Sequence, residues 1–398
     1  MRKPSLLTIF LVVFLDLVGF GIVLPLIPFL SREFEASPVE IGLVIASYSF
    51  MQFFFAPLWG ALSDRVGRRP VILLSLGGSV LSYLMFALAP SLTWVLVSRT
   101  FAGICGANIS VATAYIADIT SIANRAKGMG VIGAAFGLGF IFGPLIGGSL
   151  IQFGFHCPGF AACTLSLISL GFAIFALPES LPSEVRSKRP HPGYSLFSGW
   201  REALSTTLLI EVMLLALLSN LAFTIWETTF GLFLYDREAF QYDASKFSYL
   251  LAYVGLVAAG IQGGLIGKIV KKWGEKKAIL MGSFFTVMAF VVICLATHLS
   301  SLLVALTLLG MGTSLIRPCC YAVLSKKSGQ EDQGKVLGAA QGVSSLTRVA
   351  GPLLGGLFYK WGHSIPYWVC AGLMFLCLIL ASVLTLDSEE KKIPAPST

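Results

Sequence analysis

Charged residues are scarce in this chain. Asp, Glu, Lys and Arg make up 12% of its 398 residues, whereas a soluble globular domain carries about 25%. Hydrophobic residues reach 56%, and the mean hydropathy is +0.83. The formal net charge of +8 is spread over many short segments, which argues against a nucleic-acid-binding protein because such a protein gathers its basic residues in one patch. The composition therefore excludes an ordinary soluble domain.

Motifs of catalysis and metal binding are also missing. The four histidines are isolated, the eight cysteines show no metal-type spacing, and no HExxH, GxSxG or GxxxxGK[ST] segment occurs. These patterns mark zinc hydrolases, serine hydrolases and nucleotide-binding loops. We therefore expect a protein that is not an enzyme, that has no catalytic residue, no metal site and no cofactor, and that does not hydrolyse ATP itself.

Long apolar runs take the place of these motifs. About 20 consecutive apolar residues are enough to cross a bilayer as a helix. The sequence predicts twelve such spans, at 5–30, 40–63, 70–90, 92–117, 128–153, 157–178, 207–235, 245–269, 276–297, 300–324, 334–359 and 364–386. The expected fold is all-α: an integral membrane protein with twelve transmembrane helices.

Two pairs of segments show that the chain is duplicated. GALSDRVGRRPVIL at 60–73 matches GKIVKKWGEKKAIL at 267–280, and GPLIGG at 143–148 matches GPLLGG at 351–356, with offsets of 207 and 208 residues. Parallel repeats of this size are an architecture of membrane transporters. The expected organisation is a six-helix bundle at 1–178, a Pro- and Ser-rich cytoplasmic linker at 179–206, a second pseudo-symmetric six-helix bundle at 207–386 and a polar tail at 387–398.

Lys and Arg are unevenly divided between the alternating loops. One set of loops, which includes both ends of the chain, holds 21 of the 28 basic residues, and the other set holds 4. Loops rich in Lys and Arg stay in the cytoplasm. We therefore expect both termini to be cytoplasmic.

Four segments resemble one known family. The segment GALSDRVGRRPV resembles the loop between spans two and three of the major facilitator superfamily, and LVSRTFAGICGANISVATAYIAD at 96–118 is similar to its span-four motif. GLGFIFGPLIGG at 137–148 resembles the span-five motif of its antiporters, and LDLVGFGIVLPLIPFL at 15–30 is similar to the first span of drug:proton antiporters, especially the tetracycline exporters.

This resemblance implies a secondary active transporter that works by alternating access. It implies proton-coupled antiport, as efflux of a small amphipathic or drug-like solute, with the proton gradient as energy source. The partners expected are this small molecule, protons and the lipid bilayer, with no nucleic acid, and the chain is expected to act as a monomer in a bacterial inner membrane. Two alternatives remain: proton-coupled uptake or symport of a sugar, siderophore or organic acid, and a non-transporting membrane sensor.

Ionisable residues within spans are costly in lipid and usually functional. Asp16 in span one and Glu227 in span seven are the candidate proton-coupling carboxylates; the alternative for each is a structural role. Spans one and seven are equivalent under the repeat, so we expect both carboxylates to face one common cavity between the halves. By resemblance, Arg99 in span four also takes part in proton coupling.

Further polar and aromatic residues complete the expected substrate cavity. Arginine stays charged and can hold an anionic group, which makes Arg317 and Arg348 candidates. Pro318 should break the helix beside Arg317. The residues expected in the cavity are Asp16, Asn220, Trp226, Glu227, Arg317 and Arg348, with apolar walls from Tyr48, Phe54, Trp226 and Tyr253.

The segment at 60–70 is expected to control the conformational change rather than to bind solute. Gly67 permits a tight turn, Asp64 ends a helix and can face the N-terminus of a neighbouring helix, and Arg68 is expected to form a partly exposed ion pair with Asp118, worth ~1 kcal/mol. The plainer interpretation is a basic loop that only sets topology. The candidate gating residues are Gly60, Asp64, Arg65, Gly67, Arg68, Arg69 and Asp118.

Small residues give the predicted fifth span a bare face, which lets helices approach closely in lipid. The residues of this antiporter motif are Gly139, Gly143, Pro144, Gly147 and Gly148. We expect this face to meet its repeat counterpart, formed by Gly351, Pro352, Gly355 and Gly356, across the pseudo-two-fold axis; plain packing is the alternative.

Overall fold

The computed structural model describes residues 5–29, 33–106, 108–120, 125–181, 204–328 and 333–384. Most of the predicted linker, the predicted tail and the basic residues of both termini therefore lie outside the described residues, as do the side chains of Arg125, Lys127 and Lys335.

The described chain is helical, as lipid requires, because helices satisfy their own backbone hydrogen bonds. The first half contains α1 (Leu6–Val23) with η1 (Leu24–Phe29), α3 (Pro38–Val66), α4 (Arg68–Ala87), α5 (Leu92–Cys105), α6 (Asn108–Ile119), α7 (Arg125–Leu150) with η3 (Ile151–Phe153), and α8 (His156–Ala176). The second half contains α11 (Thr207–Asp236), α12 (Ala244–Gly260) with η4 (Ile261–Leu265), α13 (Ile266–Leu295), α14 (Leu299–Lys327), α15 (Gln333–Trp361) and α16 (Ile365–Val383).

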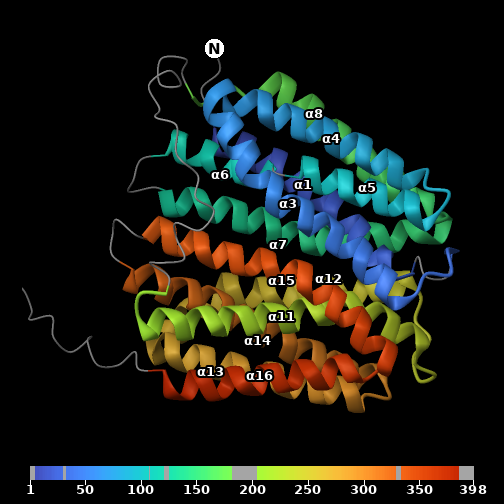
Figure 1. Cartoon of the computed structure of the whole chain (residues 1–398), viewed down its shortest axis with the longest axis vertical. Helices are drawn as coiled ribbons and strands as arrows, with labels where there is room; N and C mark the ends of the chain where they lie inside the picture. The colour runs from blue at the N-terminus through green and yellow to red at the C-terminus, as the bar shows by residue number, and fades with distance from the viewer. Residues whose placement is uncertain are drawn as a thin grey trace, which may run out of the picture.

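The twelve predicted spans are confirmed. Ten described stretches are long and apolar enough to cross a membrane, and one of them, Ala244–Leu295, holds two predicted spans; α15 supplies the twelfth. The predicted break between those two spans is found at Gly274, where two helical segments meet at a kink with non-helical backbone angles. In Figure 1 the first six spans form the upper bundle and the last six the lower bundle.

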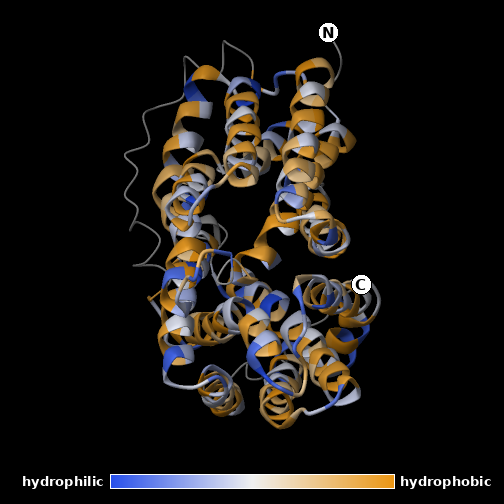
Figure 2. Ribbon diagram, turned by 90° about the vertical axis from the view of Figure 1, so that its right-hand side faces the viewer, coloured by the Kyte–Doolittle hydropathy of each residue, from blue (hydrophilic) through white to orange (hydrophobic). Residues whose placement is uncertain are grey.

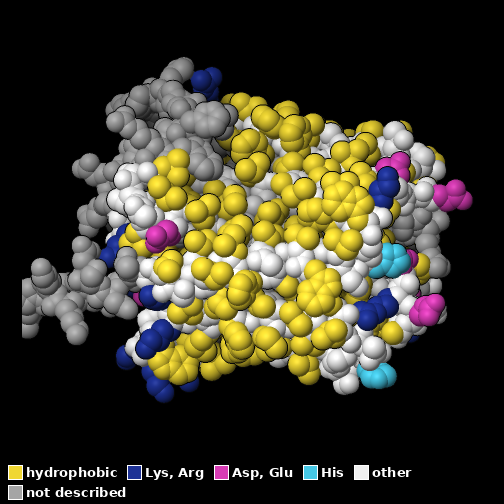
Figure 3. Space-filling view, turned by 60° about the horizontal axis from the view of Figure 1, so that its bottom comes forward, with side chains coloured by type: hydrophobic (Ala, Val, Ile, Leu, Met, Phe, Trp, Pro, Cys, Tyr) yellow, Lys and Arg dark blue, Asp and Glu magenta, His cyan; other side chains and the backbone are white. Residues whose placement is uncertain are grey.

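The outer surface agrees with a membrane environment. Figure 3 shows a continuous apolar band on the visible face, with most Lys, Arg, Asp and Glu side chains at its two ends. Figure 2 shows the same preference for apolar residues along the helices of both halves. Many exposed side chains on these helices are large and hydrophobic, among them Leu58, Phe175 and Ile379. Such a surface is stable only where lipid covers it.

Two helix pairs join the halves: α3 packs on α15, and α7 packs on α12. Glycine makes the first contact possible, because a Cβ at Gly42 would overlap the carbonyl oxygen of Pro352, and one at Gly356 would overlap that of Pro38. In the second pair, the hydroxyl groups of Ser149 and Tyr249 lie 3.2 Å apart. All these contacts lie near one end of the bundle.

The halves separate toward the other end, which carries the basic segments. Gly130 and Gly137 lie a whole number of turns from Gly148, so they share the face of α7 that meets α12. Gly148 packs on Ser248 of α12, but nothing lies within 4 Å of the position of a Cβ at Gly130 or Gly137. The helices α7 and α12 therefore diverge toward the basic end.

Candidate functional site

A cavity of about 200 Å³ lies between the two halves. Most of its wall comes from α11, α12, α13 and α14, and the first half closes it through α1, η1 and α7. Its lining includes Asn220, Trp226, Glu227 and Arg317, four of the six residues expected in a substrate cavity.

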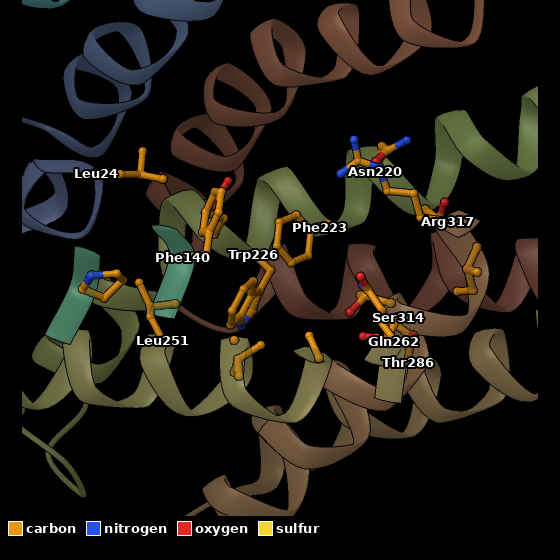
Figure 4. A pocket seen from close by; sticks show the side chains of 18 of the residues that line it. Leu24, Phe140, Asn220, Phe223, Trp226, Leu251, Gln262, Thr286, Ser314 and Arg317 are labelled. Atoms are coloured by element: carbon orange, nitrogen blue, oxygen red, sulfur yellow. The ribbon is translucent and has the colours of Figure 1, made fainter. Parts of the chain in front are cut away.

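The cavity has an aromatic side and a polar side. In Figure 4, Phe140, Phe223 and Trp226 gather on one side. On the other side are Asn220 with Arg317, and a polar group formed by Gln262, Thr286 and Ser314. Such a site can hold a molecule with an apolar body and a polar group.

Glu227 lines this cavity from α11 and is half-buried. No hydrogen bond to its carboxyl group is found in the described part of the chain. The charged group that acts on it is Arg348. Glu227 therefore places one carboxyl group in the wall of the cavity, within the electrostatic reach of Arg348.

A second cavity, of about 30 Å³, contains Asp16. Tyr48, Gln52, Tyr83 and Arg348 are among the residues that line it. Both tyrosine hydroxyl groups lie within the electrostatic reach of Asp16. This cavity lies in the first half, apart from Arg348, which α15 brings in from the second.

Arg99 lies beside this second cavity and is 2% exposed. Its guanidinium carbon lies 4.7 Å from the ring centroid of Tyr48 and 5.8 Å from that of Phe20. Contacts of this kind stabilise a cation that has lost its water. Arg99 therefore contributes positive charge near Asp16 without opening into either cavity.

The expectation of one common cavity for Asp16 and Glu227 is wrong for this conformation. The two carboxylates lie in separate cavities, and Arg348 connects them, since it lines the cavity of Asp16 and acts on Glu227. Spans one and seven are equivalent under the repeat, but the two carboxylates are not at equivalent positions. The residue 208 positions after Asp16 is Thr224, and Glu227 lies three residues further along.

Two expected wall residues and one expected helix break are also wrong. Phe54 is 47% exposed on the surface, and Tyr253 lines neither cavity but hydrogen-bonds Thr307, with 2.7 Å between the hydroxyl oxygens. The helix α14 runs unbroken through Pro318, since a membrane helix tolerates the loss of a single backbone bond. The residues that the sequence did not indicate include Phe223, Gln262, Phe290, Ser314 and Tyr83. A polar group at mid-span was the only signal for Gln262, Ser314 and Tyr83, and the two phenylalanines had none.

The segment at 60–70 forms a dense ionic network around Arg68, which is 3% exposed. Its guanidinium donates to Asp64 at 2.7 Å, to the hydroxyl of Ser63 at 2.6 Å and to Asp118 at 3.0 Å. The predicted ion pair of Arg68 with Asp118 is confirmed. Arg68 is almost fully buried in this pair, and the side chain of Asp118 is 12% exposed. The network joins α3, α4 and α6 within one half, so it braces that half.

Glu179 was not predicted as part of this network. Its carboxylate accepts hydrogen bonds from the backbone N–H groups of Arg68, at 2.9 Å, and Arg69, at 3.2 Å. It thereby neutralises the N-terminus of α4, the role that was considered for Asp64. The sequence assigned Glu179 to the linker because only the fold returns the end of α8 to the start of α4.

The two repeat segments both contain a glycine at the turn between helices, and the backbone conformation explains why. Gly67, between α3 and α4, has φ 109°, and its counterpart Gly274 has φ 76°. Residues with a Cβ are strained at such angles. Gly60 lies in open space with nothing within 4 Å of a Cβ, and Arg65 is exposed.

The buried ion pair leads to a prediction about stability. Removing one partner of a buried ion pair typically costs about 3–5 kcal/mol; here the cost should be smaller, because Asp64 still balances Arg68 when Asp118 is neutralised. In a double-mutant cycle of Arg68→Gln and Asp118→Asn, we expect a coupling energy of about 1–3 kcal/mol, measured by thermal unfolding in detergent. Arg65→Gln, an exposed arginine of the same segment, should change the unfolding temperature little. A coupling energy near zero would show that the pair contributes nothing.

Comparison with known proteins decides the family. The model of the Major Facilitator Superfamily matches residues 9–307 and 265–398, which together cover nearly the whole chain. The chain belongs to the major facilitator superfamily. It is therefore a multi-pass membrane transporter and not an enzyme.

Individual relatives indicate which branch of the superfamily this chain resembles. The class C tetracycline resistance protein of Escherichia coli is 34% identical, with 94% of this chain and 95% of that protein covered. Multidrug resistance protein 2 of Bacillus subtilis (strain 168) is 31% identical, with 97% and 96% covered. The crystal structure of the human organic anion transporter MFSD10 (TETRAN) shares 28% identity and a TM-score of 0.73, with 96% of this chain and 100% of that chain covered. The chain thus resembles the drug:proton antiporters of the superfamily.

The antiporter motif of this superfamily member packs differently from expectation. A Cβ at Gly139 would lie 2.9 Å from Leu17, and one at Gly143 would lie 2.5 Å from Gly21, so this face meets α1 of its own half. Gly148 alone among the motif glycines reaches the other half, where it meets Ser248. The predicted contact with the repeat counterpart is wrong, because each of these helices crosses a different helix of the opposite half: α7 meets α12, and α15 meets α3.

Proposed function

We propose that the chain is a proton-coupled antiporter that exports a small amphipathic or drug-like solute by alternating access. Relatives about a third identical over nearly full length are named tetracycline and multidrug resistance proteins. The bipolar cavity between the halves suits a solute with an apolar body and a polar group.

The observation that carries this proposal is the position of Arg348 between two carboxylates. It lines the cavity of Asp16 and acts on Glu227 in the cavity next to it. When one carboxylate is protonated, Arg348 interacts more strongly with the other, so the two sites titrate together. A proton that arrives at the Asp16 cavity thereby changes the charge that a solute meets beside Glu227.

The conformation supports a direction of loading. If the basic segments lie in the cytoplasm, as their excess of Lys and Arg indicates, the halves are joined at the outer end and separate at the inner end. The cavity is then in position to take up solute from the cytoplasm. This orientation, with both termini inside, agrees with efflux by antiport in a bacterial inner membrane.

Flux into proteoliposomes tests the proposal. With valinomycin and equal potassium to hold the potential at zero, an acidic lumen should drive tetracycline or another amphipathic solute inward as protons leave. Nigericin, which removes the pH gradient, should abolish accumulation. Accumulation only with an alkaline lumen would indicate symport, and accumulation independent of the gradient would remove proton coupling.

A further inference from the structure

Positive charge exceeds negative charge in the middle of the described spans. Three arginines, Arg99, Arg317 and Arg348, stand against two carboxylates, Asp16 and Glu227. Charges at this depth are retained when they pair or when they bind a ligand. Arg348 faces both carboxylates, and Arg99 lies over two aromatic rings. Within the described spans, Arg317 therefore has no carboxylate left to balance it.

The surroundings of Arg317 agree with this count. Arg317 forms no ion pair with any carboxylate in the described part of the chain. The charged group that acts on it is Arg348, which repels it, and the hydroxyl of Tyr321 lies near it. Its side chain is exposed, although it lines the cavity about ten residues from the end of α14. A cation is thus held inside the cavity, accessible and without a counter-ion among the described residues.

Polar groups beside Arg317 can bind an oxyanion together with its guanidinium group. Ser314 lies three residues before Arg317 on α14, on the same face, and also lines the cavity. Its hydroxyl is buried and has no hydrogen-bond partner among the described residues. Figure 4 shows Arg317 beside Asn220, with Ser314 and Gln262 nearby. Guanidinium, hydroxyl and amide groups all donate hydrogen bonds to carboxylate or sulfonate oxygens.

The opposite wall suits a flat apolar group. Phe140, Phe223 and Trp226 line it. An engineered apolar cavity of roughly 150 Å³ accepts benzene, so the volume of about 200 Å³ accommodates a ring together with a small polar group.

We propose that the substrate of this cavity is an aromatic organic anion, with its carboxylate or similar oxyanion bound by Arg317 and its ring against the aromatic wall. This inference rests on the proposed function, in that it takes this cavity as the transport site. It is consistent with export, because a potential negative inside drives anions outward. Each charge moved across 100 mV supports a concentration ratio of about fiftyfold. Exchange of a monoanion for one proton moves two charges in the favourable direction.

Three probes of one shape and different charge test the inference. These are 2-naphthoate, neutral 2-naphthamide and the cation 2-naphthylmethylammonium, with binding to the purified protein measured by calorimetry. The wild type should bind the anion at least about tenfold more tightly than the other two. Arg317→Gln should weaken naphthoate binding about 10- to 100-fold and leave naphthamide within about threefold. Arg317→Lys should retain part of the preference, because it keeps the charge and loses the planar fork.

Control experiments distinguish a loss of anion binding from a loss of folding, and they distinguish a failure of this inference from a failure of the proposed function. Lys360→Gln removes an exposed charge at the far end of α15 and should leave all three affinities unchanged. Thermal unfolding checks that each variant is folded, and Arg317→Lys keeps the test valid if Arg317→Gln does not fold. Preference for the cation, an equal effect of Arg317→Gln on all probes, or no binding of any probe to the wild type would overturn the inference. Anion binding that depends on Arg317, without flux driven by a pH gradient, would overturn the proposed coupling alone.

Discussion

Asp16→Asn and Glu227→Gln should each reduce solute accumulation driven by a pH gradient by at least about tenfold. Both substitutions keep the side-chain shape and remove the ability to bind and release a proton, which is the step that antiport requires. Because Arg348 contacts the surroundings of both carboxylates, neutralising either one also changes the charge balance at the other. The dependence of flux on pH should flatten in both variants.

Exchange experiments distinguish a coupling role from a binding role. Solute–solute counterflow does not need a net movement of protons, so at least one of the two variants should keep counterflow within about threefold of the wild type. Glu227→Gln should retain or strengthen the binding of an anionic solute, since it removes negative charge from the cavity. Glu211→Gln is the matched control, because Glu211 begins the same helix and lines neither cavity. Unchanged pH profiles in both variants would make these carboxylates structural.

Asp64→Asn should slow transport about tenfold and leave equilibrium solute affinity within about threefold. Asp64 lies near the end of α3, and α3 packs along α15. Their present contact, through Gly42 and Pro352, is at the end where the halves are joined. Closing the opposite end would bring Asp64 toward the start of α15, whose N-terminus attracts a carboxylate by roughly 1–2 kcal/mol. Loss of that attraction disfavours one of the two states of the cycle.

Rates and affinities measured on one preparation test this role of Asp64. Turnover in proteoliposomes should fall, whereas solute binding in detergent should remain close to that of the wild type. The thermal unfolding temperature should fall only modestly, because Arg68 loses its bond to Asp64 but keeps Asp118 as a partner. Glu40→Gln is the control at the other end of α3: Glu40 is exposed, and glutamine preserves its capping contact with Ser37. A large loss of affinity with normal exchange rates would place Asp64 in solute binding instead.

Much of the site depends on contacts that no local pattern contains. Arg68 and Asp118 were predictable as partners because one unpaired acid ended a span beside an excess of basic residues. Glu179 was not, since its place at the start of α4 depends on how α8 returns across the half. Phe54 and Tyr253 have the chemistry of a cavity wall, but helix rotation turned them away from both cavities.

The sequence by itself determined the twelve spans, the duplication, the family and the residues that carry charge into the membrane. These follow from composition and spacing, because lipid admits only long apolar helices and makes every buried charge conspicuous. The tertiary structure alone decided that Asp16 and Glu227 occupy separate cavities, that Arg348 joins them and that Arg317 forms no ion pair with a carboxylate of the described residues. The reason is rotation: a helix of 3.6 residues per turn changes the direction of a side chain by about 100° for each residue, so an offset of three residues between repeat positions moves a carboxylate from one cavity to another.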